Sequence, residues 1–148
     1  MREQLMLLII NALSTIQKFH GSDGSTRVYD YPEMGLGGYP YVVVTAFSME
    51  SKINDNQRDL RYYNFMLSII GEKFGDPGGL SQSDALKTMR NTEDTIVAYF
   101  DANNSFQGQG LGVIRSLPTN TKYGYTDSNS RVVLEIMVQF QVIAGITY

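Results

Sequence analysis

The segment Arg131–Ala144, RVVLEIMVQFQVIA, constrains the fold of this chain more than any other. Successive side chains of a β-strand point to opposite faces of a sheet, and here the two alternating sets differ in polarity. One set is mixed and includes Glu135, Gln139 and Gln141. The other set is entirely apolar and consists of Val132, Leu134, Ile136, Val138, Phe140 and Val142. This period of two predicts a long central strand with one buried face.

Two further segments predict a long β-hairpin. Tyr41–Met49 is rich in β-branched residues, and Leu60–Ile70 again alternates between two faces. The polar stretch Asn54–Asp59 lies between them and is predicted to be the turn region. A short strand is expected at Arg27–Tyr31, where Pro32 would end it.

Two helices are predicted on either side of the hairpin. Residues 3–19 carry apolar side chains at helical spacing over a wide arc, so we expect one side to pack on the sheet and the other to be available to a neighbouring subunit. The second helix follows the breaker Gly75–Gly79, with Ser81 or Ser83 as its N-cap, and ends near residues 102–104.

The segment between the second helix and the last strand is predicted to be mostly irregular. Residues 111–117 form a short strand candidate that Pro118 interrupts, and residues 119–130 are polar and turn-rich. The whole chain, residues 1–148, is expected to be one domain. Its fold class is α+β, a mainly antiparallel sheet with a long hairpin, flanked by an N-terminal helix and a second helix.

The composition limits the classes of function. Hydrophobic residues make up 43% of the chain and charged residues 18%, so a sizeable core is available. The net charge of −3 argues against a dedicated nucleic-acid binder, which normally carries a basic patch. The chain has no Cys, which excludes disulfides and thiolate metal sites. The apolar run Leu5–Ile10 is far shorter than the roughly 20 residues of a bilayer span, so we expect no membrane partner.

No set of residues predicts catalysis, a cofactor or a metal site, and we expect this protein not to be an enzyme. The single His20 has no second His or Cys to share a metal with, and is expected to be an exposed histidine at a helix end. Residues 101–107 place oxygen ligands as a calcium loop does, but Phe106 replaces the required Gly and Gly112 the required Glu. The glycine-rich stretches at 35–38 and 108–112 do not lie between a strand and a following helix, as a phosphate-binding loop must.

Strand length favours an assembly protein. A straight strand of about 14 residues spans about 47 Å, whereas a compact domain of this size is roughly 38 Å across. The long strands must therefore bend or protrude, and a protruding hairpin has open edges that suit pairing with another subunit. The candidate subunit-interface residues are those of the hairpin return and of the polar face of the last strand, namely Arg58, Arg61, Tyr62, Glu135, Gln139 and Gln141.

Many tyrosines cluster around the predicted strands, and two roles stay open for them. They are expected either to pack across strands or to act as aromatic anchors at an interface. The residues concerned are Tyr29, Tyr31, Tyr39, Tyr41, Tyr62, Tyr63, Tyr123 and Tyr125.

The order of these elements resembles the tail-terminator (tail-completion) proteins of long-tailed bacteriophages. The resemblance covers nearly the whole chain and includes a hairpin whose return strand carries Arg58 and Arg61. Its most specific part is the aromatic-Pro-x-Val motif before the hairpin, in the Tyr-Pro-Tyr-Val-Val-Val sequence at 39–44. It implies a homohexameric ring that caps the tail tube protein, terminates tube polymerisation and joins the tail to the head connector protein. It also implies a virion protein of the head–tail junction, assembled in the host cytoplasm, with viral DNA passing through its lumen without specific binding.

Three alternatives remain beside this expectation. The nearest is another neck component, such as a head-completion or head–tail connector protein. The second is an adaptor that adds a strand to one partner without forming a ring. The third is a small enzyme or ligand-binding domain, which would need a pocket lined by convergent polar groups.

Overall fold

The structure, a computed structural model, describes residues 1–21, 24–31, 38, 40–53, 58–71, 82–103, 113–128 and 131–147. In chain order these residues form α1 (Arg2–Ser14), the short 3-10 helix η1 (Gln17–Phe19), β1 (Val28–Tyr29), β2 (Tyr41–Ile53), β3 (Arg58–Ile70), α2 (Gln82–Ala102), β4 (Val113–Ser128) and β5 (Arg131–Thr147). The protein is α+β, with an N-terminal helix, a second helix and a mostly antiparallel sheet, as predicted.

The five described strands form one sheet in the order β1-β2-β3-β5-β4, in which β1 and β2 are parallel and the other neighbours antiparallel. β2 and β3 pair from Tyr41 opposite Ile70 to Ile53 opposite Asp59, which confirms the predicted hairpin. The turn region was predicted too long, because Arg58 and Asp59 already pair in β3. β5 lies between β3 and β4, so the predicted long strand is an interior strand paired on both sides, although the middle strand of the five is β3.

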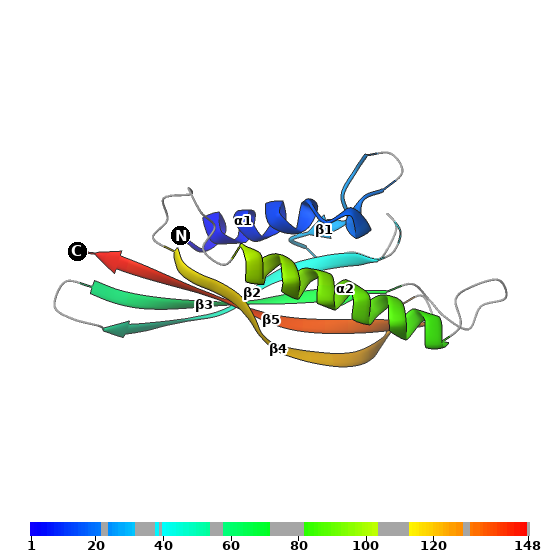
Figure 1. Cartoon of the computed structure of the whole chain (residues 1–148). Helices are drawn as coiled ribbons and strands as arrows, with labels where there is room; N and C mark the ends of the chain where they lie inside the picture. The colour runs from blue at the N-terminus through cyan, green and yellow to red at the C-terminus, as the bar shows by residue number, and fades with distance from the viewer. Residues whose placement is uncertain are drawn as a thin grey trace.

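The core lies between the sheet and the two helices, which cover the same face (Figure 1). α1 contacts β1 and β2, whereas α2 contacts β4 and β5. On β5 Ile136, Val138, Phe140 and Val142 are buried, as is Ala144, which confirms this part of the predicted apolar face. The Phe140 ring lies 4.3 Å from the Phe100 ring of α2, measured between centroids. Burying one side chain of this kind stabilises the fold by roughly 1.5–3 kcal/mol before entropy is counted.

The predicted loop at residues 119–130 is wrong, because β4 continues from Val113 to Ser128. Pro118 does not end this strand, although it lacks a backbone donor. β4 is the last strand of the described sheet, and proline is tolerated in edge strands and at bulges. Its pairing with β5 is irregular between Pro118 and Asn120, which is where the missing donor is accommodated.

The first helix is shorter than predicted and is followed by a separate turn of 3-10 helix. The hydroxyl groups of Ser14 and Thr15 donate to the carbonyls of Ile10 and Ala12, each at 2.7 Å. Such local bonds compete with helix continuation, and Ile16 already has an extended conformation (φ −78°, ψ 120°). His20 is half-buried rather than exposed, with Nε2 2.6 Å from the carbonyl oxygen of Ser14.

The second helix was predicted to lie on the surface of the sheet, and its buried residues are Met89, Thr92, Ile96 and Phe100. Ser83 is not its N-cap, because the helix begins at Gln82 and Ser83 already lies in its first turn. The other proposed cap, Ser81, lies outside the described residues.

Arg27 holds the segment between η1 and β2 in place. Its guanidinium group donates three hydrogen bonds to backbone carbonyls: Nε to Pro40 (2.8 Å), Nη1 to His20 (3.0 Å) and Nη2 to Lys18 (2.7 Å). Its main chain also accepts a bond from the N–H of Val42, at 3.0 Å. One planar side chain thus fixes the end of η1 relative to the start of β2.

Replacing Arg27 by Lys is expected to lower the free energy of unfolding by about 2–4 kcal/mol. A single ammonium group cannot reproduce the fork of donors, and each hydrogen bond from a charged donor contributes about 1.5–3 kcal/mol. Urea denaturation followed by circular dichroism measures the loss. Arg90→Lys on the exposed surface of α2 is the matched control, and an equal loss in both variants would contradict the role of the three bonds.

Ser116 is a buried polar residue whose hydroxyl oxygen has no hydrogen-bond partner among the described residues. Ser116→Ala is therefore expected to stabilise the protein by about 1 kcal/mol, since a buried unpaired hydroxyl costs free energy. Calorimetry should show a melting temperature higher by a few degrees. Thr92→Val is the control, because the equally buried Thr92 hydroxyl donates to the Thr88 carbonyl at 2.9 Å and its removal should bring no gain.

Candidate subunit interface

One face of the sheet has neither α-helix on it, and we call it the open face (Figure 1). Its members alternate along the strands with the residues of the core between the sheet and the helices. At one end of this face Tyr41 and Ile70 are buried in a separate small cluster with Tyr29 and Val43, and the other members are half-buried or exposed. These other members are Val43, Thr45, Ser48, Glu50 and Lys52 on β2, Leu60, Tyr62, Asn64, Met66 and Ser68 on β3, and Glu135, Met137, Gln139, Gln141 and Ile143 on β5. This mixture of amides, methionines and short polar residues differs from the apolar side of the same strands.

Hydrogen bonds between side chains connect three strands across the open face. The Asn64 amide donates to the hydroxyl oxygen of Ser48 at 3.1 Å, and the Gln141 amide donates to the Asn64 carbonyl oxygen at 3.0 Å. Next to this row, Met66 of β3 lies opposite Gln139 of β5 in the register. The fixed amides define positions for polar contacts, while methionine adapts its shape to a neighbouring surface.

The structure brings four of the six candidate interface residues to the open face. Tyr62, Glu135, Gln139 and Gln141 are all half-buried there and come from β3 and β5. Arg61 lies on the opposite face of β3, since it pairs with the buried Ala144 and alternates with Tyr62. The remaining candidate is the first residue of β3, Arg58, whose backbone pairs with Thr147 and whose side chain lies outside the described part.

The hairpin strands extend beyond the helices at the end of the sheet where β5 also ends (Figure 1). Glu50, Ser51 and Lys52 are exposed in this part of β2, and Tyr62 opposite them is half-buried. The Lys52 ammonium group lies 4.8 Å from the centroid of the Tyr62 ring, a cation–π contact that orders this end. The predicted conflict between strand length and domain size is therefore resolved by strands that protrude.

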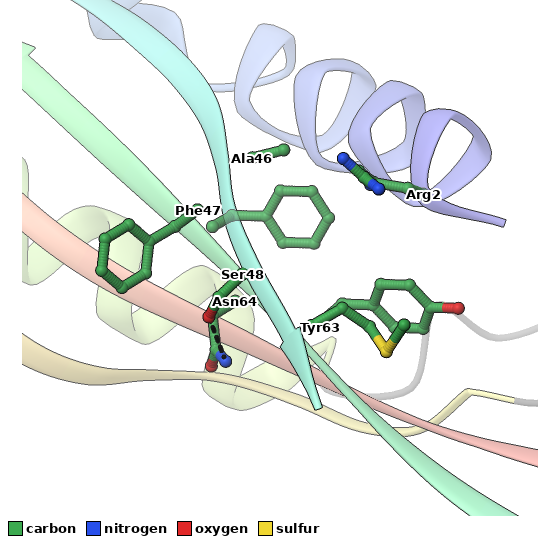
Figure 2. A pocket seen from close by; sticks show the side chains of 8 residues that line it. Arg2, Ala46, Phe47, Ser48, Tyr63 and Asn64 are labelled. Carbon is green, nitrogen blue, oxygen red and sulfur yellow. Dashed lines mark hydrogen bonds between the residues drawn. The ribbon is translucent and has the colours of Figure 1, made fainter. Parts of the chain in front are cut away.

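A β-bulge in β2 was not predicted from the sequence. The register with β3 shifts between Ala46 and Ser48, so Phe47 is the extra residue and is 62% exposed. Figure 2 shows Phe47 and Ser48 on one side of the β2 ribbon, with Arg2 and Tyr63 on the other. The sequence contains one indication of the bulge, because the run of β-branched residues ends at Thr45 and is followed by the mixed sequence Ala-Phe-Ser-Met.

A cavity of about 260 Å³ lies beside this bulge, at the start of α1 (Figure 2). Its lining mixes the Arg2 side chain with aromatic and small residues. The residues are Arg2, Ala46, Phe47, Ser48, Met49, Tyr63, Asn64 and Phe65. Within the described residues no group of three or more His, Cys, Asp or Glu side chains gathers here or elsewhere to hold a metal ion.

The tyrosines divide between the two roles that the sequence left open. Tyr41 and Tyr63 are buried, and the Tyr29 ring packs edge-on against Tyr41 at 6.1 Å, so these residues serve packing. Tyr31 is 53% exposed with its ring 5.5 Å from Tyr29, and Tyr62 is half-buried on the open face. Tyr39 and the side chains of Tyr123 and Tyr125 lie outside the described residues.

Comparison with known proteins adds no relative. No protein-family model matches the chain, and no curated protein matches its sequence at a significant level. Among the described residues, no helix is both long and apolar enough to cross a membrane. The fold and the candidate interface thus define an α+β protein whose sheet has one helix-covered face and one open face.

Proposed function

We propose that this protein is a tail terminator of a long-tailed bacteriophage. Copies form a homohexameric ring at the head–tail junction of the virion. The ring caps the tail tube, terminates its polymerisation and joins the tail to the head connector. Viral DNA passes through the lumen without specific binding, which suits a chain of net charge −3 because a basic lumen would retain DNA.

The observation that carries this proposal is the open face together with the protruding end of the sheet. Strands that extend beyond their helices expose unpaired edges, which monomeric proteins avoid and which subunits of an assembly use to contact their neighbours. The hydrogen-bonded row of Ser48, Asn64 and Gln141 gives this surface a fixed polar pattern, as specific interfaces have. The architecture supports the proposal through its resemblance to the tail-terminator proteins, which rests on the order of the helices, the long hairpin and the final alternating strand.

A polymerisation assay tests the function. Purified tail-tube subunits are allowed to polymerise with and without this protein, and tube lengths are measured by negative-stain electron microscopy. The proposal expects tubes to stop growing once capped, at about six copies of this protein per tube end. Unchanged tube growth together with binding to head connector proteins would instead identify a head-completion or connector component. Unchanged growth without any binding to neck components would exclude both roles.

A further inference from the structure

Over most of its length the outer edge of β2 pairs with no other described strand. β1 pairs only with Val42 and Val43, and from Thr45 to Ile53 no other described strand lies along this edge. The far edge of the sheet belongs to β4, where Pro118 and two register irregularities interrupt regular pairing. β2 is therefore the edge that is better suited to accept another strand.

The charges on this edge are arranged for pairing with an identical strand. Glu50 and Lys52 are both exposed and lie two residues apart on the open face. In an antiparallel pair of identical strands related by a two-fold axis at Ser51, position 50 of one copy lies directly opposite position 52 of the other. Each Glu50 then faces a Lys52, twice in one interface, and directly opposed residues interact across strands.

We propose that the outer edge of β2 pairs with the same edge of a second copy of this protein, antiparallel and centred on Ser51. The outward-pointing backbone groups of residues 49–53, which pair with no described strand, form the hydrogen bonds of a continuous intermolecular sheet. Pairing also covers Met49, which is 45% exposed in the single chain. The bulge at Phe47 bends the strand and ends the paired stretch on one side.

This contact differs from the contacts that build a ring. A two-fold interface uses the same patch on both subunits, whereas a ring requires two different patches that meet head to tail. The pair is therefore a form of the free protein, outside the proposed ring. It holds or fails independently of tube capping, because it is measured on the protein alone.

The test is a charge swap followed by sedimentation velocity over a range of protein concentrations. The wild-type protein is expected to dimerise, and Glu50→Lys or Lys52→Glu alone should raise the dimer dissociation constant roughly tenfold to a hundredfold, since each turns two attractions into two repulsions. The double variant Glu50→Lys/Lys52→Glu restores opposite charges in the same register and should recover dimerisation. Thermal unfolding of all four proteins verifies that each remains folded.

Two results would overturn the proposal. A wild-type protein that stays monomeric up to millimolar concentration would show that Glu50 and Lys52 protect the edge against pairing. A double variant that dimerises no better than the single variants would rule out the two-fold register at Ser51, because only that register restores both opposite-charge pairs.

Discussion

Phe140→Asp is expected to abolish folding. Phe140 is 1% exposed, lies in the middle of β5 and packs against the Phe100 ring. The substitution removes the aromatic contacts and places a carboxylate where no water or cation reaches it, at a combined cost of about 5 kcal/mol or more. Since domains of this size are stable by about 5–15 kcal/mol, most or all of the stability is lost. Circular dichroism should show loss of the native signal or a much lower urea midpoint.

The neighbouring residue supplies the matched control. Gln139 lies on the open face, so Gln139→Asp introduces the same side chain one position away on the other side of the sheet. Its cost is expected to stay within about 1 kcal/mol, because the carboxylate remains accessible to water. If both variants unfolded equally, the open face would be part of the core.

Gln139→Asp is also expected to abolish ring assembly while leaving the monomer folded. Gln139 lies near the centre of the open face, opposite Met66, where an interface would exclude water. A buried carboxylate without a partner costs several kcal/mol on assembly, and about 4 kcal/mol corresponds to a nearly thousandfold loss of affinity. Size-exclusion chromatography with light scattering, and the tube-length assay, measure this effect.

The control for assembly is Lys87→Asp, which changes an exposed residue on α2, the helix that lies on the other face of the sheet. This variant should still form rings and still stop tube growth. Rings formed equally well by both variants would show that subunits meet away from both substituted residues, for example through the strand edges. That result would remove the open face from the proposed interface.

The central features of the fold were predictable because they depend on local alternation. The period of two in Arg131–Ala144 identified the long interior strand β5, and the β-branched segment Tyr41–Met49 with the alternating segment Leu60–Ile70 identified the hairpin. The same alternation placed Glu135, Gln139 and Gln141 on the less apolar face, which is the open face of the structure. Such strands can be recognised from the sequence because a strand with one buried face carries apolar and polar side chains at alternating positions.

The features that were missed depend on contacts between distant segments. β4 is polar and contains Pro118, and it becomes a strand because the regular edge of β5 is available to pair with it. The role of Arg27 could not be predicted from the sequence, because its side chain binds backbone carbonyls of residues distant in the chain. These are the carbonyls of Lys18, His20 and Pro40. Strand alternation places Arg61 on the opposite face of β3 from Tyr62. The prediction assigned both residues to one interface because both lie in the return strand of the hairpin, and it did not take this alternation into account.

The most direct test of the proposed function is electron microscopy of this protein mixed with its tail-tube subunits, followed by class averaging of the tube ends. The account predicts a six-fold ring of this protein on one end of each tube, with the open lumen continuous with that of the tube. It also predicts that Gln139→Asp leaves the tube ends bare. A wild-type protein that remains monomeric and never associates with tubes would contradict the account.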